Sequence, residues 1–270
     1  MARQSALITV MTNAAYRAAR GLKRDFGEVE QLQVSTKGPS DFVAAADLQA
    51  EKILRDELAR ARPEYGFLLE EGGVVEGTDP RRRWIIDPLD GTLNFLHGIP
   101  HFAISIGLER DGQIVAGVIY EPLRDEMFWA ELGAGAFVND HRLRVSTRGN
   151  MGDSVFATGV PWRGRPNHRS FLCQLEAVMA VSAGIRRFGS AALDLAYVAA
   201  GRYEGFWESS LNPWDIAAGV LLVREAGGFV TTIDGSREVI RAPSILAVND
   251  RLHGALMAVL AQAAPSPDGA

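Results

Sequence analysis

Helical and strand patterns follow one another along this chain in an order that few architectures accommodate. Residues 4–26 and 45–61 place apolar side chains three and four positions apart, which is typical of amphipathic helices. Between residues 102 and 145 the pattern changes to β-rich runs separated by turn signals, of which Asp111-Gly112 is a strong hairpin signal. The first half therefore predicts two helices followed by a meander of strands.

The second half alternates between strands and helices. Strands are expected near 154–158, 184–188, 204–208, 229–233 and 244–248, and helices near 168–183, 190–200, 213–226 and 250–262. With no repeat and no low-complexity linker, the chain predicts one α/β body over residues 1–264. An α+β half of about 1–150 would precede an α/β half of about 151–264, and residues 265–270 would form a flexible tail.

Composition excludes several classes of protein. No apolar run reaches the roughly 18–20 residues that a membrane-spanning helix needs, and the N-terminus lacks the continuous apolar region of a signal peptide. One cysteine and five histidines, without HxH or HExxH spacing, argue against a thiolate or histidine metal site. The 28 basic and 33 acidic residues give a net charge of −5, which offers no general attraction to nucleic acid. We therefore expect a cytoplasmic protein whose metal chemistry, if any, uses carboxylates.

The apolar run of residues 83–87 is predicted to be a strand that the following proline ends, with Asp87 at its carboxyl end. Asp90 follows three residues later, so a tight turn can point both carboxylates at one spot. Gly91 allows a ligand to approach the backbone closely, and Thr92 places a hydroxyl beside exposed amides. This combination suits Mg²⁺ and a phosphate ester. An Asp-Pro turn and a helix cap explain either carboxylate alone, but not the whole string.

A second acidic pair, Glu70-Glu71, follows the short apolar run of residues 67–69. Because strand ends of one sheet commonly share a site, we predict that Glu70 joins Asp87. The role of Glu71 stays open, since neighbouring residues on an extended segment face opposite ways.

A third acid, Asp215, lies in the first turn of a predicted helix that Asn212 caps and Pro213 begins. The helix dipole alone favours an acid there. A divalent cluster, however, needs more anionic ligands than one turn supplies, so Asp215 is also a candidate ligand.

Together these strings resemble the inositol monophosphatase family of Mg²⁺-dependent phosphatases. The matching segments are Leu69-Glu70-Glu71, residues 84–92, residues 94–100, residues 187–192, residues 199–201, residues 213–219 and residues 225–228. The resemblance covers roughly residues 5–262 and implies a layered αβαβα sandwich of the sugar phosphatase type, assembled as a homodimer, with inhibition by Li⁺.

Carried over by position, the resemblance implies a site for two to three Mg²⁺ ions. Glu70, Asp87, Asp90 and the Leu89 carbonyl would hold the first metal sites, and Asp215 would join Asp87 and Asp90 at the second. The resemblance further implies that Gly91 and Thr92 supply phosphate-binding amides, while Thr92 and Glu70 orient the attacking water. The expected catalytic residues are Glu70, Asp90 and Thr92.

Substrate hydroxyl groups would meet a second set of residues by the same resemblance. This set is Asp90, Gly189, Ser190, Ala191, Glu208 and Asp215. Lys37 and Asp47 match polar residues that flank the metal site, although a loop lysine and a helix cap are their ordinary roles. His97 and His101 are given no role.

The predicted reaction is hydrolysis of a phosphate monoester by in-line attack of a metal-activated water. The expected substrate is myo-inositol 1-phosphate, with fructose 1,6-bisphosphate, histidinol phosphate and adenosine 3′,5′-bisphosphate as alternatives. An aspartyl-phosphate mechanism is a rival, but it uses Asp-x-Asp-x-Thr, whereas two residues separate Asp87 from Asp90.

A regulatory protein linked to RNA or transcription is the alternative from another class, since some bacterial relatives that resemble this chain are linked to transcription. Arg81-Arg82-Arg83 and Arg186-Arg187 are the basic residues available for such a partner. Solvated arginines that flank strands are their ordinary interpretation.

Overall fold

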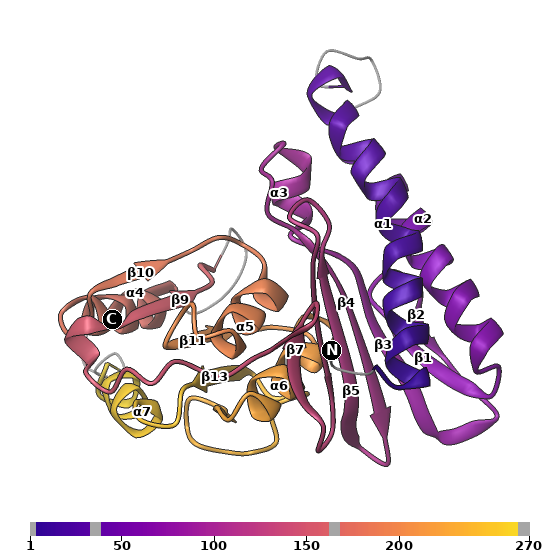
Figure 1. The fold of residues 1–270 in the computed structure, drawn as a ribbon. Coiled ribbons are helices and arrows are strands. Elements are labelled where there is room, and N and C mark those ends of the chain that lie inside the picture. Colours follow the sequence, from indigo (N-terminus) through magenta and orange to yellow (C-terminus); the bar gives the residue numbers. More distant parts are fainter. Residues whose placement is uncertain (1–3, 33–38, 162–167, 264–270) are drawn as a thin grey trace.

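The computed structural model describes residues 4–32, 39–161 and 168–263, so Lys37 and the expected tail of residues 265–270 lie outside the described residues. The fold is a sandwich of five layers, αβαβα, which confirms the fold class expected from the sequence (Figure 1). The helices are α1 (Ala6–Leu32), α2 (Pro39–Ala61), α3 (Thr92–Leu96), α4 (His168–Met179), α5 (Ala191–Ala199), α6 (Pro213–Glu225) and α7 (His253–Gln262).

Within the described residues, one sheet has eight strands in the order β2-β1-β3-β4-β5-β6-β7-β8. Its strands are β1 (Tyr65–Leu69), β2 (Gly73–Val75), β3 (Asp79–Asp90), β4 (Ala103–Arg110), β5 (Gln113–Glu121), β6 (Glu126–Glu131), β7 (Gly135–Val138) and β8 (His141–Arg142). Neighbouring strands are antiparallel except β1 and β3, which are parallel. The hairpin expected at Asp111-Gly112 joins β4 to β5, and both residues have the positive φ of a tight primed turn.

The second sheet of the described chain has five strands in the order β10-β9-β11-β13-β12. Its strands are β9 (Val155–Thr158), β10 (Gly184–Arg186), β11 (Gly205–Ser209), β12 (Phe229–Thr231) and β13 (Ser244–Val248). The parallel pairs β10/β9 and β9/β11 confirm the expected alternation of strands and helices, while β13 and the edge strand β12 add antiparallel pairs.

The apolar core follows the layers. One cluster packs α1 and α2 on the outer face of the large sheet, and another packs α5 and α6 between the two sheets. A third lies between the small sheet and the outer helices α4 and α7. Because the middle cluster contains residues of both sheets, we propose that the two halves form one folding unit over residues 1–264.

Helix α6 lies unusually close to the large sheet, because glycines face it. A Cβ built on Gly107 would lie 3.0 Å from the Ala217 side chain, and one on Gly117 would lie 2.9 Å from the Ala218 backbone. This contact fixes the position of α6, whose first turn carries Asp215.

Several expected boundaries were wrong. Strand β3 does not end at Asp87 but continues to Asp90, with an irregular register to β4 between these residues. Pro88 is tolerated there because its missing N–H falls where the ladder is already interrupted. Helix α1 ends at Leu32 rather than residue 26, and α4 ends at Met179 rather than residue 183.

Candidate active site

The parallel pair of strands β1 and β3 brings two acids together. Leu69 of β1 is paired with Ile86 of β3. The next residues, Glu70 and Asp87, therefore lie side by side toward the carboxyl ends of these two strands. The Glu70 N–H donates to the Ile86 carbonyl over 3.2 Å. Burial raises the pKa of both carboxyl groups; contact with Asp87 lowers that of Glu70, and contact with Glu70 raises that of Asp87. Asp87 is only 2% exposed.

The turn after Asp87 folds back on itself through hydrogen bonds between residues two and three positions apart. The Leu89 N–H donates to Asp87 Oδ1 over 2.9 Å, and the Thr92 hydroxyl donates to the Leu89 carbonyl over 2.9 Å. Gly91 has a φ of 97°, and a Cβ on it would lie 3.0 Å from the His101 carbonyl. Glycine is therefore required at this position both by conformation and by space.

Asp90 connects the first half of the chain to the second. Its Oδ2 accepts hydrogen bonds from the Ser190 hydroxyl at 2.5 Å and from the Ala192 N–H at 2.8 Å. Ser190 also caps α5 by accepting the Leu193 N–H. Asp90 thus lies against the N-terminus of α5, where unpaired N–H groups favour a negative charge.

Asp215 approaches the same region from the first turn of α6. It completes a capping box with Asn212, whose N–H donates to Asp215 Oδ2 over 2.7 Å. Pro213 begins the helix, as the sequence predicted.

The four carboxylates influence one another strongly. Burial raises the pKa of Asp87 well above its ordinary value, and Asp90, Glu70 and Asp215 raise it further. Burial also raises the pKa of Asp90 to about 6, and it raises the pKa of Glu70. A buried anionic cluster of this kind is stabilised by protons or by cations.

The donor set fits a hard divalent cation. Glu70 Oε2 is buried without a hydrogen-bond partner, and carboxylate and carbonyl oxygens are what Mg²⁺ prefers. As they stand, no three acidic, histidine or cysteine side chains of the described residues are arranged to hold an ion. The hydrogen bonds that Asp90 and Asp215 accept from the protein fall on their Oδ2 atoms.

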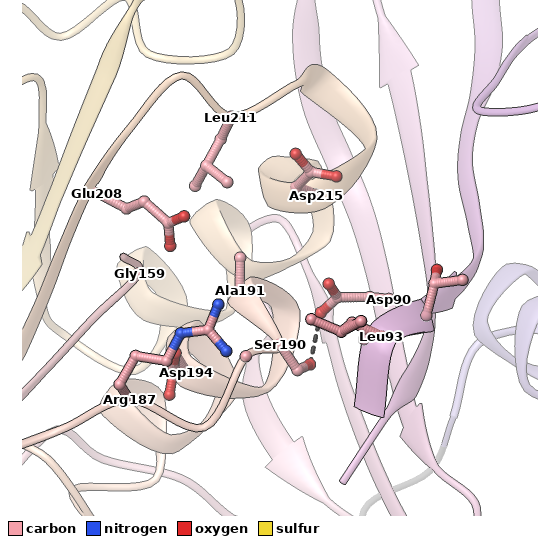
Figure 2. A pocket seen from close by; sticks show the side chains of 13 residues that line it. Asp90, Leu93, Gly159, Arg187, Ser190, Ala191, Asp194, Glu208, Leu211 and Asp215 are labelled. Atoms are coloured by element: carbon pink, nitrogen blue, oxygen red, sulfur yellow. Dashed lines mark hydrogen bonds between the residues drawn. The ribbon is translucent and has the colours of Figure 1, made fainter. Parts of the chain in front are cut away.

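A cavity of about 480 Å³ opens beside Asp90 and Asp215 (Figure 2). All of the residues expected to contact substrate line it: Asp90, Gly91, Thr92, Gly189, Ser190, Ala191, Glu208 and Asp215. Glu70, Asp87 and Leu89 are not among its lining residues. The side chain of Glu208 lies over Gly159, where a Cβ would come within 2.0 Å of the carboxyl carbon.

Helix α2 supplies two further acids behind Glu70. Asp47 is 3% exposed, and its Oδ1 has no hydrogen-bond partner. Burial, followed by Glu70, Glu71 and Glu51, raises the pKa of Asp47 to about 8. Glu51 accepts the Glu71 N–H over 2.9 Å and so holds the chain that follows Glu70.

The residues left open by the sequence have different surroundings. Glu71 and His97 are exposed. His101 is buried, and burial followed by the charge of Arg124 lowers its pKa to about 4, so its ring stays neutral at neutral pH. Its carbonyl accepts a hydrogen bond from Asn94 at 2.8 Å.

Sequence reasoning missed several residues of this region. They are Glu51 behind the site, and Gly159, Asp194 and Leu211 in the cavity wall. Two signals were available: Asp47 and Glu51 are four residues apart on one helix face, and Asp194 is a lone acid in the apolar helix ALDLAYVA.

A layered αβαβα sandwich with acids from two neighbouring parallel strands and a helix start beside one cavity defines a phosphatase of the sugar phosphatase type. The chain belongs to the inositol monophosphatase family, whose family model matches residues 3–266. The predicted family and the predicted enzyme class, a phosphoric monoester hydrolase, are thereby confirmed.

Individual relatives agree with this assignment. The chain is 60% identical over 254 residues to an inositol-1-monophosphatase of Mesorhizobium japonicum, covering 94% of this chain and 96% of that one. It is 40% identical over 252 residues to the Nus factor SuhB of Escherichia coli, covering 93% and 94%. The native crystal structure of the extragenic suppressor protein suhB of Bartonella henselae superposes with a TM-score of 0.88 at 57% identity, covering 95% of this chain and 98% of that one.

Among the helices of the described ranges, none is long and apolar enough to cross a membrane.

Proposed function

We propose that this protein hydrolyses myo-inositol 1-phosphate to myo-inositol and phosphate with the help of Mg²⁺. The observation that carries the proposal is the grouping of Glu70, Asp87, Asp90 and Asp215 beside a cavity of about 480 Å³. The similarity to the inositol-1-monophosphatase of M. japonicum supports this choice of substrate.

The residues proposed to hold two to three Mg²⁺ ions are the carboxylates of this group with the Leu89 carbonyl. Glu70, Asp87, Asp90 and Leu89 would form one part of the site, and Asp87, Asp90 and Asp215 the other. When bound, the ions would neutralise phosphate charge, lower the pKa of the attacking water and stabilise the leaving oxygen. The buried Oε2 atom of Glu70, which has no hydrogen-bond partner, supports this assignment.

The residues around the proposed ion sites would position the phosphate and the attacking water, and would accept the proton of that water. The backbone N–H groups of Gly91 and Thr92 would bind phosphate oxygens at the start of α3. Glu70 and Thr92 would orient the attacking water, with the Glu70 carboxylate as the proton acceptor. The water oxygen forms the new bond to phosphorus as the ester P–O bond breaks; the released alkoxide takes up a proton from solvent water, and Glu70 returns its proton to solvent. Ser190 would keep Asp90 in place through their hydrogen bond of 2.5 Å.

The cavity wall is proposed to select a polyol. Glu208, Asp215 and the segment 189–191 line the wall and can bind hydroxyl groups. Fructose 1,6-bisphosphate, histidinol phosphate and adenosine 3′,5′-bisphosphate remain the alternative substrates, because the phosphate-binding turn does not distinguish them. The homodimer, the sensitivity to Li⁺ and the cytoplasmic location are proposed on the family resemblance.

A role in transcription is supported by the name of the E. coli relative, a Nus factor. Three of the five arginines that the sequence offered for it carry matched charges, however: Arg81 pairs with Asp111, Arg82 with Asp79, and Arg83 with Glu109. These ion pairs favour the ordinary structural role of the arginine run, and we do not propose nucleic acid as a partner.

The test is a phosphate-release panel with Mg²⁺ over inositol 1-phosphate and the three alternative esters. The proposal expects the highest kcat/KM for inositol 1-phosphate, and it expects loss of release from the same ester in Asp90→Asn. A higher kcat/KM for another ester would replace the substrate. Trapping a hydroxylamine-sensitive acyl phosphate would replace the mechanism with a covalent one.

A further inference from the structure

Asp194 is a buried acid whose place in the fold has no structural explanation. It lies in α5, a helix of nine residues that are all buried, and it is 1% exposed. It is the single charged residue of that helix, and it lies in the wall of the cavity (Figure 2).

The carboxylate of Asp194 is poorly compensated. Its Oδ1 is buried without a hydrogen-bond partner. Burial raises its pKa well above the ordinary value, and Glu208 and Asp90 raise it further, whereas Arg187 lowers it. The Arg187 side chain lies in the same wall, next to Asp194 (Figure 2). An acid in this setting destabilises the folded chain unless a ligand satisfies it.

Helix capping does not account for Asp194. Ser190 is the N-cap of α5, and its hydroxyl already accepts the Leu193 N–H. A negative charge near a helix start is favoured by the dipole, but the preference does not require a buried carboxylate with an oxygen that lacks a hydrogen-bond partner.

We propose that Asp194 is a specificity residue that accepts hydrogen bonds from substrate hydroxyl groups on the side of the ring away from the phosphate. Asp194 and Glu208 both line the cavity wall, with Arg187 next to Asp194 (Figure 2). A polyol ring carries several hydroxyl donors, and two neighbouring carboxyl groups with one guanidinium provide acceptors and a balancing charge for them. The proposal rests on the proposed function, since it assigns the polyol end of the same substrate.

Two variants separate this role from a structural one. Asp194→Asn keeps the shape of the side chain and one acceptor oxygen, whereas Asp194→Leu keeps a similar branched shape and removes all acceptors. Glu204→Gln is the matched control, because Glu204 is equally buried but has partners: its Oε2 accepts the Val155 N–H over 2.7 Å and its Oε1 pairs with Arg148.

Two ligands separate ring recognition from phosphate binding. Myo-inositol 1-phosphate and cyclohexyl phosphate share a six-membered ring and a phosphate, but only the first carries ring hydroxyls. Binding is measured by calorimetry with Ca²⁺ in place of Mg²⁺ to slow turnover, and the melting temperature of each variant is measured without ligand.

For inositol 1-phosphate we expect Kd to rise about tenfold in Asp194→Asn and up to about a hundredfold in Asp194→Leu. For cyclohexyl phosphate we expect a change within about twofold, and neither variant should melt below the wild type. Glu204→Gln should melt lower without changing the ratio of the two dissociation constants.

An equal loss for both ligands, no loss for either, or a fall in melting temperature like that of the control would overturn the proposal. Binding of inositol 1-phosphate without its hydrolysis by the wild type would reject the proposed function alone. Failure of the wild type to bind either ligand would reject both.

Discussion

Removal of divalent ions is expected to make the folded state lose stability as the pH rises from 6.5 to 8. Burial, with Glu70, Glu71 and Glu51 nearby, raises the pKa of Asp47 to about 8 from an ordinary value of 3.8. Between pH 3.8 and about pH 8 the Asp47 carboxyl group is ionised in the unfolded chain but still carries its proton in the folded chain. The free energy of unfolding therefore falls with rising pH and stops falling above the folded pKa.

The size of this effect follows from the pH interval. Each pH unit changes the free energy of unfolding by about 1.4 kcal/mol per group, so 1.5 units correspond to about 2 kcal/mol. For a chain of this size that lowers the melting temperature by roughly 4–8 °C. His101 acts in the opposite direction, because its pKa is lowered to about 4, but its contribution changes only below about pH 6.5. The chosen window avoids it.

The assay is thermal unfolding at pH 6.5 and pH 8, with EDTA or with excess Mg²⁺, for the wild type and Asp47→Asn. A cation bound at Glu70 favours the ionised form of its neighbours, so Mg²⁺ should raise the melting temperature more at pH 8 than at pH 6.5. In EDTA, Asp47→Asn should lose less stability over this window than the wild type. A gain from Mg²⁺ that is the same at both pH values, or EDTA-treated wild type that melts higher at pH 8, would refute the reasoning.

Three further substitutions test the surroundings of the site. Glu51→Gln weakens the hydrogen bond that Glu51 accepts from the Glu71 N–H over 2.9 Å. The Mg²⁺ concentration for half-maximal phosphate release should therefore rise about tenfold. An unchanged Mg²⁺ titration would contradict this role of Glu51. Gly159→Ala places a Cβ 2.0 Å from the Glu208 carboxyl carbon, so the Glu208 side chain must move. KM for inositol 1-phosphate should rise several-fold, with little change in KM for cyclohexyl phosphate. Equal changes in the two KM values would argue against a role of Glu208 in binding the ring hydroxyls. In Gly117→Ala the added Cβ lies 2.9 Å from the α6 backbone. The free energy of unfolding, measured by urea titration, should fall by about 1–3 kcal/mol. An unchanged value would mean that α6 can shift freely.

The meeting of Glu70 and Asp87 was predictable because it depends on local patterns. Each acid follows a short apolar run, and a parallel pairing of the two strands places both acids at the same edge. The capping box of Asp215 was also readable, since Asn212 and Pro213 are ordinary residues at a helix start. What the patterns could not give is the contact between Asp90 and Ser190, which joins residues 100 positions apart.

The errors have physical causes as well. Pro88 predicted the end of a strand, but the ladder between β3 and β4 is irregular there and does not need the missing N–H. Asp194 was overlooked because a helix with the composition of α5 predicts core packing, and only the structure places its carboxylate in a cavity wall. Burial of single polar groups is a tertiary property that periodicity does not encode.

The proposed metal site is tested most directly by phosphate release from myo-inositol 1-phosphate. Release is measured as a function of Mg²⁺ concentration for the wild type and for Asp87→Asn. The variant is expected to fold, because burial already favours the neutral form of Asp87, and an unchanged melting temperature in EDTA checks this. We expect saturable Mg²⁺-dependent release by the wild type and a loss of at least about a hundredfold in kcat/KM in the variant. Release near the wild-type level by Asp87→Asn, or release by the wild type that needs no divalent ion, would contradict the metal site proposed here.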